Sequence, residues 1–587
     1  MQPSRLKNVT RYYVLAFTLA LLLRFAGLGT SPLGDSEAAW ALQALGVAQG
    51  EHPLLGPQPL YVSLTGLSFF LFGATNFLAR FLPALAGSLP VLAVYLFRDR
   101  LKPVSAVLLA AFLALDPGLI ALSRQAGSLI PALAFTLLAW AFWSRKQPRP
   151  AGVMAGLALL SGPGLWAGLL GLGLTWAAML AFERKGQASS GQAPNQLPVN
   201  IRFEEIKPAL VFAGATILLG GTSLFLSPAG LSAWLTSLPA YLSGWLHPSG
   251  VPVGRLVLAL VVYQPLALLL GGASVVRGWQ ERNPLRMRLS LWLLAAILLA
   301  LLYPARQVGD LAWIVLPLWS LAALELAGYA EVERNERREV AGMATLVALL
   351  LAFSWLDYAG IALDPLNPAN LAPNTIQVGG QILSQSLPPT RYLLLISVLL
   401  LLVVSTVLVA LGWSTRIARL GSVWGLVVAL GIYSLGVAWG TTGLRTPDGW
   451  ELWWPDARPA QAGLLLSSVE DLSDWSAGDP AAQPVALVEV ESSALQWDLR
   501  GRSVQLLTAP DLEQAPPMVI TSQIEDLNLE TPYRGQDFVW RQAPSWEILT
   551  AYDWIHWSVF RKLPRDSEII ILWVRNDLFP DAQQSLP

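Results

Sequence analysis

The feature that most constrains this chain is its repeated apolar runs, many of which match the thickness of a bilayer. A membrane helix needs about 20 mostly apolar residues. The sequence is 54% hydrophobic and only 13% charged, with a mean hydropathy of +0.50. The runs predict thirteen membrane spans, at 11–29, 77–97, 103–121, 128–143, 150–161, 164–182, 208–226, 253–275, 289–303, 311–329, 339–357, 391–412 and 420–440. The expected fold class is mainly α, a polytopic membrane helical bundle.

Basic residues between the runs predict an orientation, because Lys and Arg concentrate in cytoplasmic loops. With the N-terminus inside, every second loop is basic: Arg5, Lys7, Arg11; Arg98, Arg100, Lys102; Arg145, Lys146, Arg149; Arg184, Lys185, Lys207; Arg277, Arg282, Arg286, Arg288; Arg334, Arg337, Arg338; Arg416, Arg419. Merging 150–161 with 164–182 would invert every later loop, so the two runs are kept as separate spans. The chain is expected to be a multi-pass protein of the plasma membrane, with 12–25 as a retained signal anchor.

Composition excludes several kinds of site. The chain has no cysteine, which excludes disulfides, thiolate metal ligands and a cysteine nucleophile. The histidines are three, His52, His247 and His556, so we expect no multi-histidine metal site and no divalent metal cofactor. A net charge of −1 gives no indication of a nucleic-acid partner.

A change in composition after residue 440 predicts two domains. Residues 1–440 are expected to form the transmembrane domain, with an outer loop at 30–76. Residues 441–587 are polar, with strand-like runs "VALVEV", "VQLL", "MVIT" and "EIIILWV", and a helix-like "ESSALQWDLRGR" between the first two. Strand, helix and strand at this spacing predict a soluble extracytoplasmic α/β domain.

Two carboxylates follow the first span, in "GDSEAAWALQALGVAQG". Asp35 or Ser36 is a good helix N-cap and Glu37 would lie in the first turn, where the helix dipole favours a negative charge. The structural interpretation is therefore that both carboxylates stabilise a helix start. Two positions apart on a helix, they would not share a face, so they form a pair only if Asp35 precedes the helix.

The segment "GEHPLLGPQPLYVSLTGLSFFLFGATNFLARFLPALAGSLP" and the later "ALDPGLIALSR" carry a family resemblance. An acidic motif ahead of "HP", then Phe72–Gly73, Arg80 and Gly87, is similar to the GT-C membrane glycosyltransferases. The resemblance is to the dolichyl-phosphate-mannose protein mannosyltransferase and aminoarabinose transferase group (glycosyltransferase family 39-like), over about residues 20–145. The sequence departs from that pattern twice. Ser36 stands at the Asp of an Asp-Glu pair, and Leu129 stands where a second acidic residue is usual.

The resemblance implies sugar transfer from a polyprenyl-phosphate carrier to an extracytoplasmic protein, lipid or glycan acceptor. Asp35 or Glu37 would be the base that takes the acceptor's proton. Arg80, Arg124 and Arg306 would neutralise the carrier phosphate, and His52 would contact it or close the loop. Each also has a structural interpretation, because arginines near helix ends often reach to headgroups and a lone interfacial histidine is more often structural. The lipid-linked sugar is the only cofactor implied.

The outer loop "SPAGLSAWLTSLPAYLSGWLHPSG" is amphipathic, with Trp234, Tyr241 and Trp245. It predicts an interfacial helix with aromatic anchors, or else a wall of the lipid-donor groove or a sugar-stacking surface.

Two other functions stay open. The missing second acidic residue favours a catalytically degenerate GT-C-like subunit that acts in assembly or in handling lipid-linked glycans. A transporter or flippase is disfavoured, because the predicted spans carry few charges near their midpoints, where ionisable groups would mark a pathway.

Overall fold

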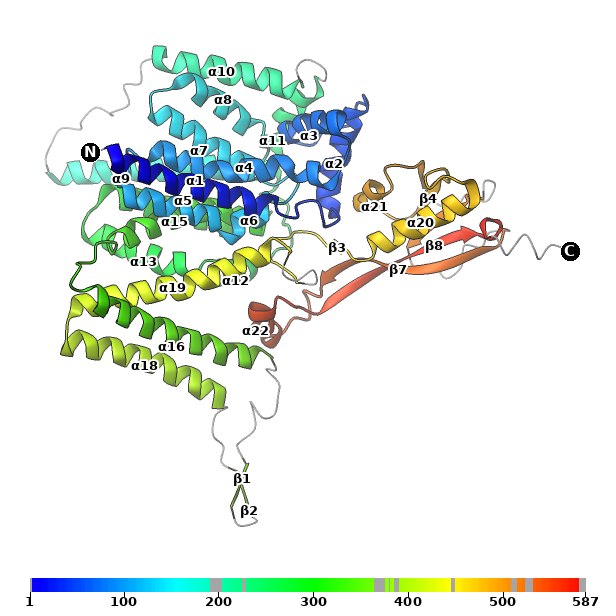
Figure 1. Cartoon of the computed structure of the whole chain (residues 1–587). Helices are drawn as coiled ribbons and strands as arrows, with labels where there is room; N and C mark the ends of the chain where they lie inside the picture. The colour runs from blue at the N-terminus through cyan, green and yellow to red at the C-terminus, as the bar shows by residue number, and fades with distance from the viewer. Residues whose placement is uncertain are drawn as a thin grey trace.

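The computed structural model describes residues 3–190, 203–223, 228–363, 375–378, 381–384, 390–444, 449–507, 515–522 and 531–579. Figure 1 shows long helices lying side by side, with a sheet-containing domain at one end of them. The helices up to residue 190 are α1 (Pro3–Phe25), α2 (Asp35–Ala48), α3 (Pro59–Phe72), α4 (Asn76–Phe97), α5 (Pro103–Leu115), α6 (Pro117–Ser123), α7 (Ile130–Ser144), α8 (Pro148–Leu159) and α9 (Gly164–Ser190). Those that follow are α10 (Phe203–Gly221), α11 (Ala229–Ser243), α12 (Val253–Tyr263), α13 (Pro265–Gln280), α14 (Pro284–Leu302), the 3-10 turn η1 (Val308–Leu311), α15 (Ala312–Ala327), α16 (Arg337–Leu363), α18 (Thr390–Gly412) and α19 (Thr415–Thr441).

Each predicted span coincides with a helix or a bent pair of helices. Within the described residues, seven helices are long and apolar enough to cross a membrane, or nine if each bent pair is one span. The count of thirteen therefore stays a prediction. The runs at 150–161 and 164–182 form separate helices, α8 and α9, as expected. The loop between α10 and α12 contains the helix α11, which is the amphipathic segment of the sequence.

Two of the predicted spans are broken at a proline. The chain bends by 51° between α5 and α6 and by 92° between α12 and α13. Asp116 and Gln264 precede Pro117 and Pro265, and a residue before proline is pushed away from helical geometry. The two breaks meet in the bundle, where the Gln264 amide donates to the Asp116 carboxylate at 2.5 Å and Trp319 Nε1 donates to it at 2.7 Å.

Charged groups are therefore buried inside the bundle at these breaks. Arg24 and Asp116 have no exposed surface. Arg24 Nη1 donates to the carbonyl of Ala114 at 3.1 Å and Nη2 to that of Leu113 at 3.2 Å, which satisfies the end of α5. Buried polar groups need such partners. Here the side chains of Arg24, Asp116 and Gln264 link the end of α5 to the starts of α6 and α13.

The C-terminal part, called here the sheet domain, comprises the described residues from 449 onward. Its elements are β3 (Arg458–Pro459), α20 (Ala462–Ala477), β4 (Val485–Val488), α21 (Ser493–Asp498), β5 (Val504–Leu507), β6 (Met518–Ser522), β7 (Tyr533–Pro544), α22 (Ala551–Phe560), β8 (Arg565–Arg575) and the turn η2 (Asn576–Leu578). The sheet order is β3-β7-β8-β6-β4-β5, with β4 parallel to β5 and β6 and the other pairs antiparallel. The α/β class and all four predicted strands are confirmed, while β7 was not predicted.

The sheet domain shares a hydrophobic core with the helices nearest to it. One cluster of buried residues joins Leu33, Tyr61 and Phe69 to Val485 and Trp497. The ring of Phe69 lies 5.6 Å from that of Trp497, whose Nε1 donates to Asn76 Oδ1 at 2.7 Å. Trp497, Trp540 and Trp557 are completely buried, so these tryptophans act as core residues. The junction between bundle and sheet domain is thus a packed interior.

The predicted orientation can be tested directly, because the chain has no cysteine of its own. Ser476 in the sheet domain and Asn335 in the loop before α16 are both exposed. In intact cells, an impermeant thiol reagent should label Ser476→Cys and should leave Asn335→Cys unlabelled until the membrane is permeabilised. Labelling of Asn335→Cys alone would invert the orientation.

Candidate functional site

The N-terminus of α2 brings together groups from distant parts of the chain. The N-cap is Gly34, so the expectation that Asp35 or Ser36 caps the helix is wrong by one or two residues, and Asp35 is the first helical residue. Glu37 Oε2 accepts the N–H of Gly34 at 3.2 Å, and Asp456 Oδ2 accepts the N–H of Ser36 at 2.7 Å. A carboxylate from the sheet domain thus satisfies a backbone donor that a capping side chain would normally satisfy.

Glu37 forms a buried, two-point ion pair with Arg80 of α4. Arg80 Nε donates to Oε1 at 2.8 Å and Nη2 to Oε2 at 2.6 Å. Oε1 also accepts the N–H of Ala126 at 2.9 Å, and Oε2 the N–H of Gly34. A carboxylate has about four acceptor positions, and all of those of Glu37 are filled. Burial alone would raise the pKa of Glu37, but the charge and hydrogen bonds of Arg80, with these two N–H groups, hold it below its usual value.

Arg80 in turn fixes the loop that leads from α1 to α2. Its Nη1 donates to the carbonyl of Ser31 at 2.9 Å and to that of Leu28 at 3.3 Å, and its Nη2 to the carbonyl of Pro32 at 3.0 Å. The Arg80 guanidinium therefore donates its hydrogen bonds to the Glu37 carboxylate and to backbone carbonyls of this loop. Arg80 was singled out from the sequence because it falls on the family pattern, but its ion pair with Glu37 was not predicted.

Asp35 points away from Glu37, toward the sheet domain. Its Oδ1 accepts the Ser492 hydroxyl at 2.7 Å and the N–H of Ala494 at 3.0 Å, and its Oδ2 accepts Arg541 Nη1 at 2.7 Å. Burial would raise the pKa of Asp35, but these hydrogen bonds and the Arg541 charge lower it from its usual value. As expected from their spacing, the two carboxylates do not share a face.

The other expected ligands lie in different surroundings. Arg124 caps α1, with Nη1 donating to the carbonyls of Ala26 at 2.8 Å and Arg24 at 3.0 Å. Arg306 Nε donates to the carbonyl of Tyr303 at 3.0 Å and Nη1 to that of Val251 at 3.3 Å. No described residue accepts a hydrogen bond from its Nη2. His52 is exposed. The structure thus joins Arg80 to Glu37, and among the described residues neither Arg306 nor His52 forms a hydrogen bond or ion pair with these two side chains.

Asp456 is a carboxylate that sequence reasoning missed. It is partly exposed and lies against Gly34 and Ser36. Burial, and more weakly the charges of Glu37 and Asp35, raise the pKa of Asp456, against the hydrogen bonds from Ser36. It is 420 residues from Ser36 along the chain, so no local pattern could have revealed it.

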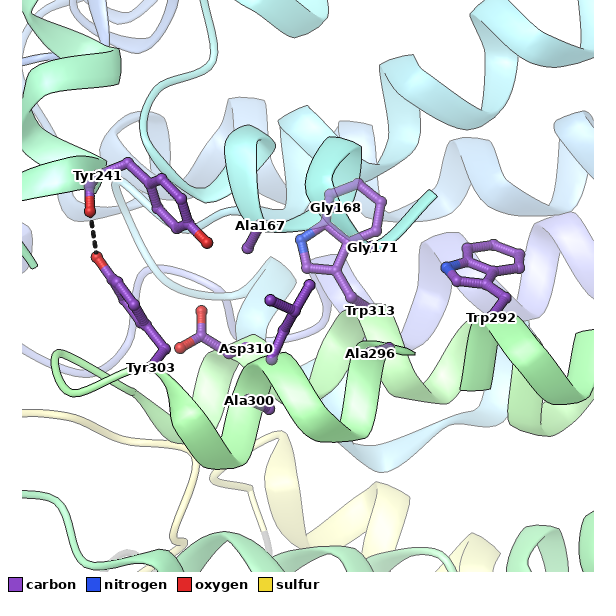
Figure 2. A pocket seen from close by; sticks show the side chains of 11 residues that line it. Ala167, Gly168, Gly171, Tyr241, Trp292, Ala296, Ala300, Tyr303, Asp310 and Trp313 are labelled. Atoms are coloured by element: carbon purple, nitrogen blue, oxygen red, sulfur yellow. Dashed lines mark hydrogen bonds between the residues drawn. The ribbon is translucent and has the colours of Figure 1, made fainter. Parts of the chain in front are cut away.

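A pocket opens between α9, α11, α14 and η1 (Figure 2). Its empty volume is about 380 Å³, including its open mouth. Small residues of α9 and α14 form an apolar slot in this pocket: Ala167, Gly168, Gly171, Ala296 and Ala300. The rest of the wall includes Tyr241, Tyr303, Trp313 and Asp310. Tyr303 and Arg306 belong to the same short loop, so the pocket and the least engaged of the expected arginines lie on one segment.

The loop at 124–129 connects the pocket with the α2 junction. Ala126 binds Glu37, Gln125 Nε2 donates to the carbonyl of Trp453 at 2.9 Å, and Leu129 packs near Gly309 of η1. Gly127 has φ +69°, and a Cβ there would approach Trp40 Cδ1 to 2.2 Å, so the close packing against α2 requires glycine. Leu129, at the family's second acidic position, contributes an apolar contact instead of a carboxylate.

The described residues contain no group of three or more acidic, histidine or cysteine side chains that could hold a metal ion.

The Glu37–Arg80 pair generates a stability prediction. Glu37→Gln leaves a buried guanidinium without its counter-charge, which should lower the free energy of unfolding by about 3–5 kcal/mol. The partly exposed Asp35–Arg541 pair is the matched comparison, and Asp35→Asn should lower it by about 1 kcal/mol or less. Thermal unfolding of the purified variants measures the difference. Equal losses for the two variants would contradict this ranking.

Comparison with known proteins gives one family-model match and several similar solved structures. The family model described as dolichyl-phosphate-mannose-protein mannosyltransferase matches residues 41–179. A search of the curated proteins finds no match. Among solved structures, ArnT from Cupriavidus metallidurans bound to undecaprenyl phosphate superposes with a TM-score of 0.51 at 15% identity, covering 98% of this chain and 99% of that one.

Two further structures are similar over parts of their length. The oligosaccharyltransferase of Archaeoglobus fulgidus matches at 13% identity and a TM-score of 0.42, over 88% of this chain and 69% of that one. The arabinosyltransferase EmbB of Mycobacterium smegmatis matches at 13% identity and a TM-score of 0.41, over 77% and 43%. The comparison with ArnT carries the fold assignment. The resemblance seen in the sequence is therefore confirmed: the family model matches within its range, and this chain shares the fold of the ArnT structure over nearly the whole length of both chains.

Proposed function

We propose that the protein is an integral membrane glycosyltransferase that transfers a sugar from a polyprenyl-phosphate carrier to an extracytoplasmic protein, lipid or glycan acceptor. The observation that carries the proposal is the fold shared with ArnT over nearly the whole of both chains. The ArnT structure holds undecaprenyl phosphate, which supports a carrier of the same chemistry here.

Arg306 is the arginine best suited to the carrier phosphate. Arg80 and Arg124 direct their guanidinium groups at a carboxylate and at backbone carbonyls, so releasing them would leave buried acceptors unsatisfied. Arg306 donates to two backbone carbonyls, and its Nη2 has no acceptor among the described residues, so Nη2 can donate to a ligand. A phosphate leaving group is a weak base, so it needs a cation more than an acid. His52, exposed on the outer loop, would approach the phosphate only by closure of that loop.

Asp35 is the better base of the two expected carboxylates. Glu37 has no acceptor position left, whereas Asp35 accepts three hydrogen bonds and keeps about one position for an acceptor hydroxyl. Because its partners belong to the sheet domain, an acceptor would reach it at the junction of α2 with that domain. Asp456, on the other side of Ser36, is the alternative carboxylate at the same place.

A degenerate, non-catalytic subunit is the second candidate. It is favoured by the filled acceptor positions of Glu37 and by Ser36 and Leu129 at the two acidic positions of the family pattern. Such a protein would bind the carrier and take part in assembly or in handling lipid-linked glycans.

The test is turnover by the purified full-length protein with radiolabelled polyprenyl-phosphate sugars and a panel of acceptors. We expect transfer by the wild type and a loss of about two or more orders of magnitude for Asp35→Asn, with thermal stability nearly unchanged. Asp456→Asn is the parallel variant.

Three results would revise the proposal. A loss confined to Asp456→Asn would move the base role to that residue. Normal rates for both variants in an active protein would remove the base from this junction. Carrier binding without any turnover by the wild type would support the degenerate subunit.

A further inference from the structure

The end of the bundle remote from the sheet domain contains two buried donors that have no acceptor among the described residues. Figure 1 shows the N-terminus and the start of α1 at this end. Tyr13 of α1 is 5% exposed, and its hydroxyl has no hydrogen-bond partner in the part of the chain that the structure describes. Arg98, which follows α4, has a buried Nη1 that likewise lacks an acceptor there. Buried polar groups without partners are unfavourable, so both donors indicate an acceptor from outside the chain.

The two donors belong to one cluster of side chains. The rings of Tyr13 and Tyr95 meet edge to face with centroids 5.2 Å apart, and the Arg98 guanidinium lies over the Tyr95 ring at 3.9 Å. On its other side, Arg98 Nε lies 3.7 Å from Asp99 Oδ1. The Arg98 side chain is 34% exposed, so a ligand at the surface of the bundle can reach this cluster, called here the Tyr13–Arg98 cluster.

Basic residues surround the Tyr13–Arg98 cluster, and the nearby carboxylate is already engaged. Asp99 is the only acidic residue in the segments 95–102 and 144–149. Its Oδ2 accepts Arg145 Nη2 at 2.8 Å, and Arg100 Nη2 donates to the carbonyl of Ser144 at 3.0 Å, so the turn after α4 is fixed to the turn after α7. Other basic side chains at this end are exposed and form no ion pair with a described residue: Arg11, Lys102, Lys146 and Arg149. The surroundings of the cluster therefore favour an anion.

An apolar surface adjoins these charges. The side chains of Val14, Leu15 and Leu22 on α1 are exposed, in a helix predicted to cross the membrane. Tyr12 of α1 and Trp140 of α7 are exposed at the same end, and tyrosine and tryptophan concentrate where a bilayer meets water. The aromatic residues thus indicate that the Tyr13–Arg98 cluster lies at the depth of lipid headgroups.

These features select one kind of ligand. The phosphodiester of a phospholipid has charged oxygens that accept hydrogen bonds from a hydroxyl and from a guanidinium. Its acyl chains match the exposed face of α1, which inorganic phosphate or an acidic peptide would leave uncovered. The excess of cations favours a lipid with a net negative charge over a zwitterionic one.

We propose that the Tyr13–Arg98 cluster binds the phosphate of an anionic phospholipid, whose acyl chains lie against α1. The bound lipid joins α1 to the turn after α4, so it stabilises the folded protein. This site lies outside the junction of α2 with the sheet domain, and it does not depend on the proposed transfer reaction.

The first test removes a single hydroxyl. Tyr13→Phe keeps the ring and its contact with Tyr95, and Tyr12→Phe is the matched control because Tyr12 is 57% exposed on the same helix. The delipidated full-length protein in maltoside detergent is titrated with phosphatidylglycerol, and native mass spectrometry gives the Kd of the first bound lipid. Tyr13→Phe should weaken this binding by about tenfold, the effect of losing one hydrogen bond to a charged group. Tyr12→Phe should leave the Kd unchanged.

Thermal unfolding of the same samples separates a lipid ligand from a structural role. Without lipid, Tyr13→Phe should unfold at the wild-type temperature, because the change removes no hydrogen bond within the protein. With phosphatidylglycerol, the wild type should unfold at a higher temperature than the variant. A lower unfolding temperature for Tyr13→Phe without lipid would show that the hydroxyl already has a partner, and would overturn the inference. Equal lipid affinities of wild type and Tyr13→Phe would also overturn it.

The second test concerns the charge of the headgroup. The wild type should bind phosphatidylglycerol about fivefold or more tightly than phosphatidylcholine, because basic residues near a membrane surface attract anionic lipids. Arg98→Gln should weaken phosphatidylglycerol binding by about tenfold. Arg534→Gln, an equal loss of charge at an exposed position of β7, should not change it.

Three results of the second test would contradict the proposal. Equal wild-type affinities for the two lipids would remove the selection for a negative charge. An unchanged affinity of Arg98→Gln for phosphatidylglycerol would place the lipid elsewhere. If inorganic phosphate raised the unfolding temperature as much as phosphatidylglycerol does, the acyl chains would contribute nothing and the site would not be a lipid site.

Discussion

The ion pair between Glu37 and Arg80 is the interaction on which the end of the helical bundle next to the sheet domain depends. It joins α2 to α4, and through the remaining hydrogen bonds it also holds the loop before α2 and the loop at 124–129. A buried pair contributes little net stability when compared with apolar residues of the same shape. The pair instead fixes the positions of α2, α4 and the two loops relative to one another, because either partner without the other would be a buried, uncompensated charge.

The sheet domain is built onto that arrangement. Asp35 and Ser36 are the first two residues of α2. Asp35 accepts hydrogen bonds from Ser492 and Arg541, and the N–H of Ser36 donates to Asp456. A hydrophobic cluster shared by α2, α3 and the sheet continues the contact into the interior. The domain boundary near residue 440, drawn from composition, stays a prediction, and across it the side chains pack as they do within one domain.

The positions of the carboxylates bear on how such a protein would do chemistry. A base needs an open acceptor position near the reacting hydroxyl, and saturation of Glu37 removes it from that role in this conformation. Of the other charged groups, Asp35 and Asp456 lie where α2 meets the sheet domain, whereas Asp310 lies in η1 and Arg306 just before it. The loop at 124–129 also contains Leu129, which stands where the family pattern considered in the sequence analysis predicts a second acidic residue.

Much of the fold is determined by local sequence. Apolar runs of bilayer length specify the helices, prolines after Asp116 and Gln264 specify the breaks, and short strand-like runs specify β4, β5, β6 and β8. The start of α2 was found within one or two residues, since capping depends on neighbours along the chain. Arg80 could be selected because it falls in a motif.

Which side chains meet was decided by the tertiary structure alone. Arg80 lies 43 residues from Glu37, and Ala126 lies 89 residues from it. The contact between the two helix breaks joins Gln264 to Asp116, which lie 148 residues apart, and no local pattern indicated the strand β7. The pocket of Asp310 combines residues from position 167 to position 313. Hydrogen bonds and burial act between atoms in space, whereas sequence patterns report only the preferences of neighbouring residues, so the partners of each carboxylate are set by what packing brings next to it.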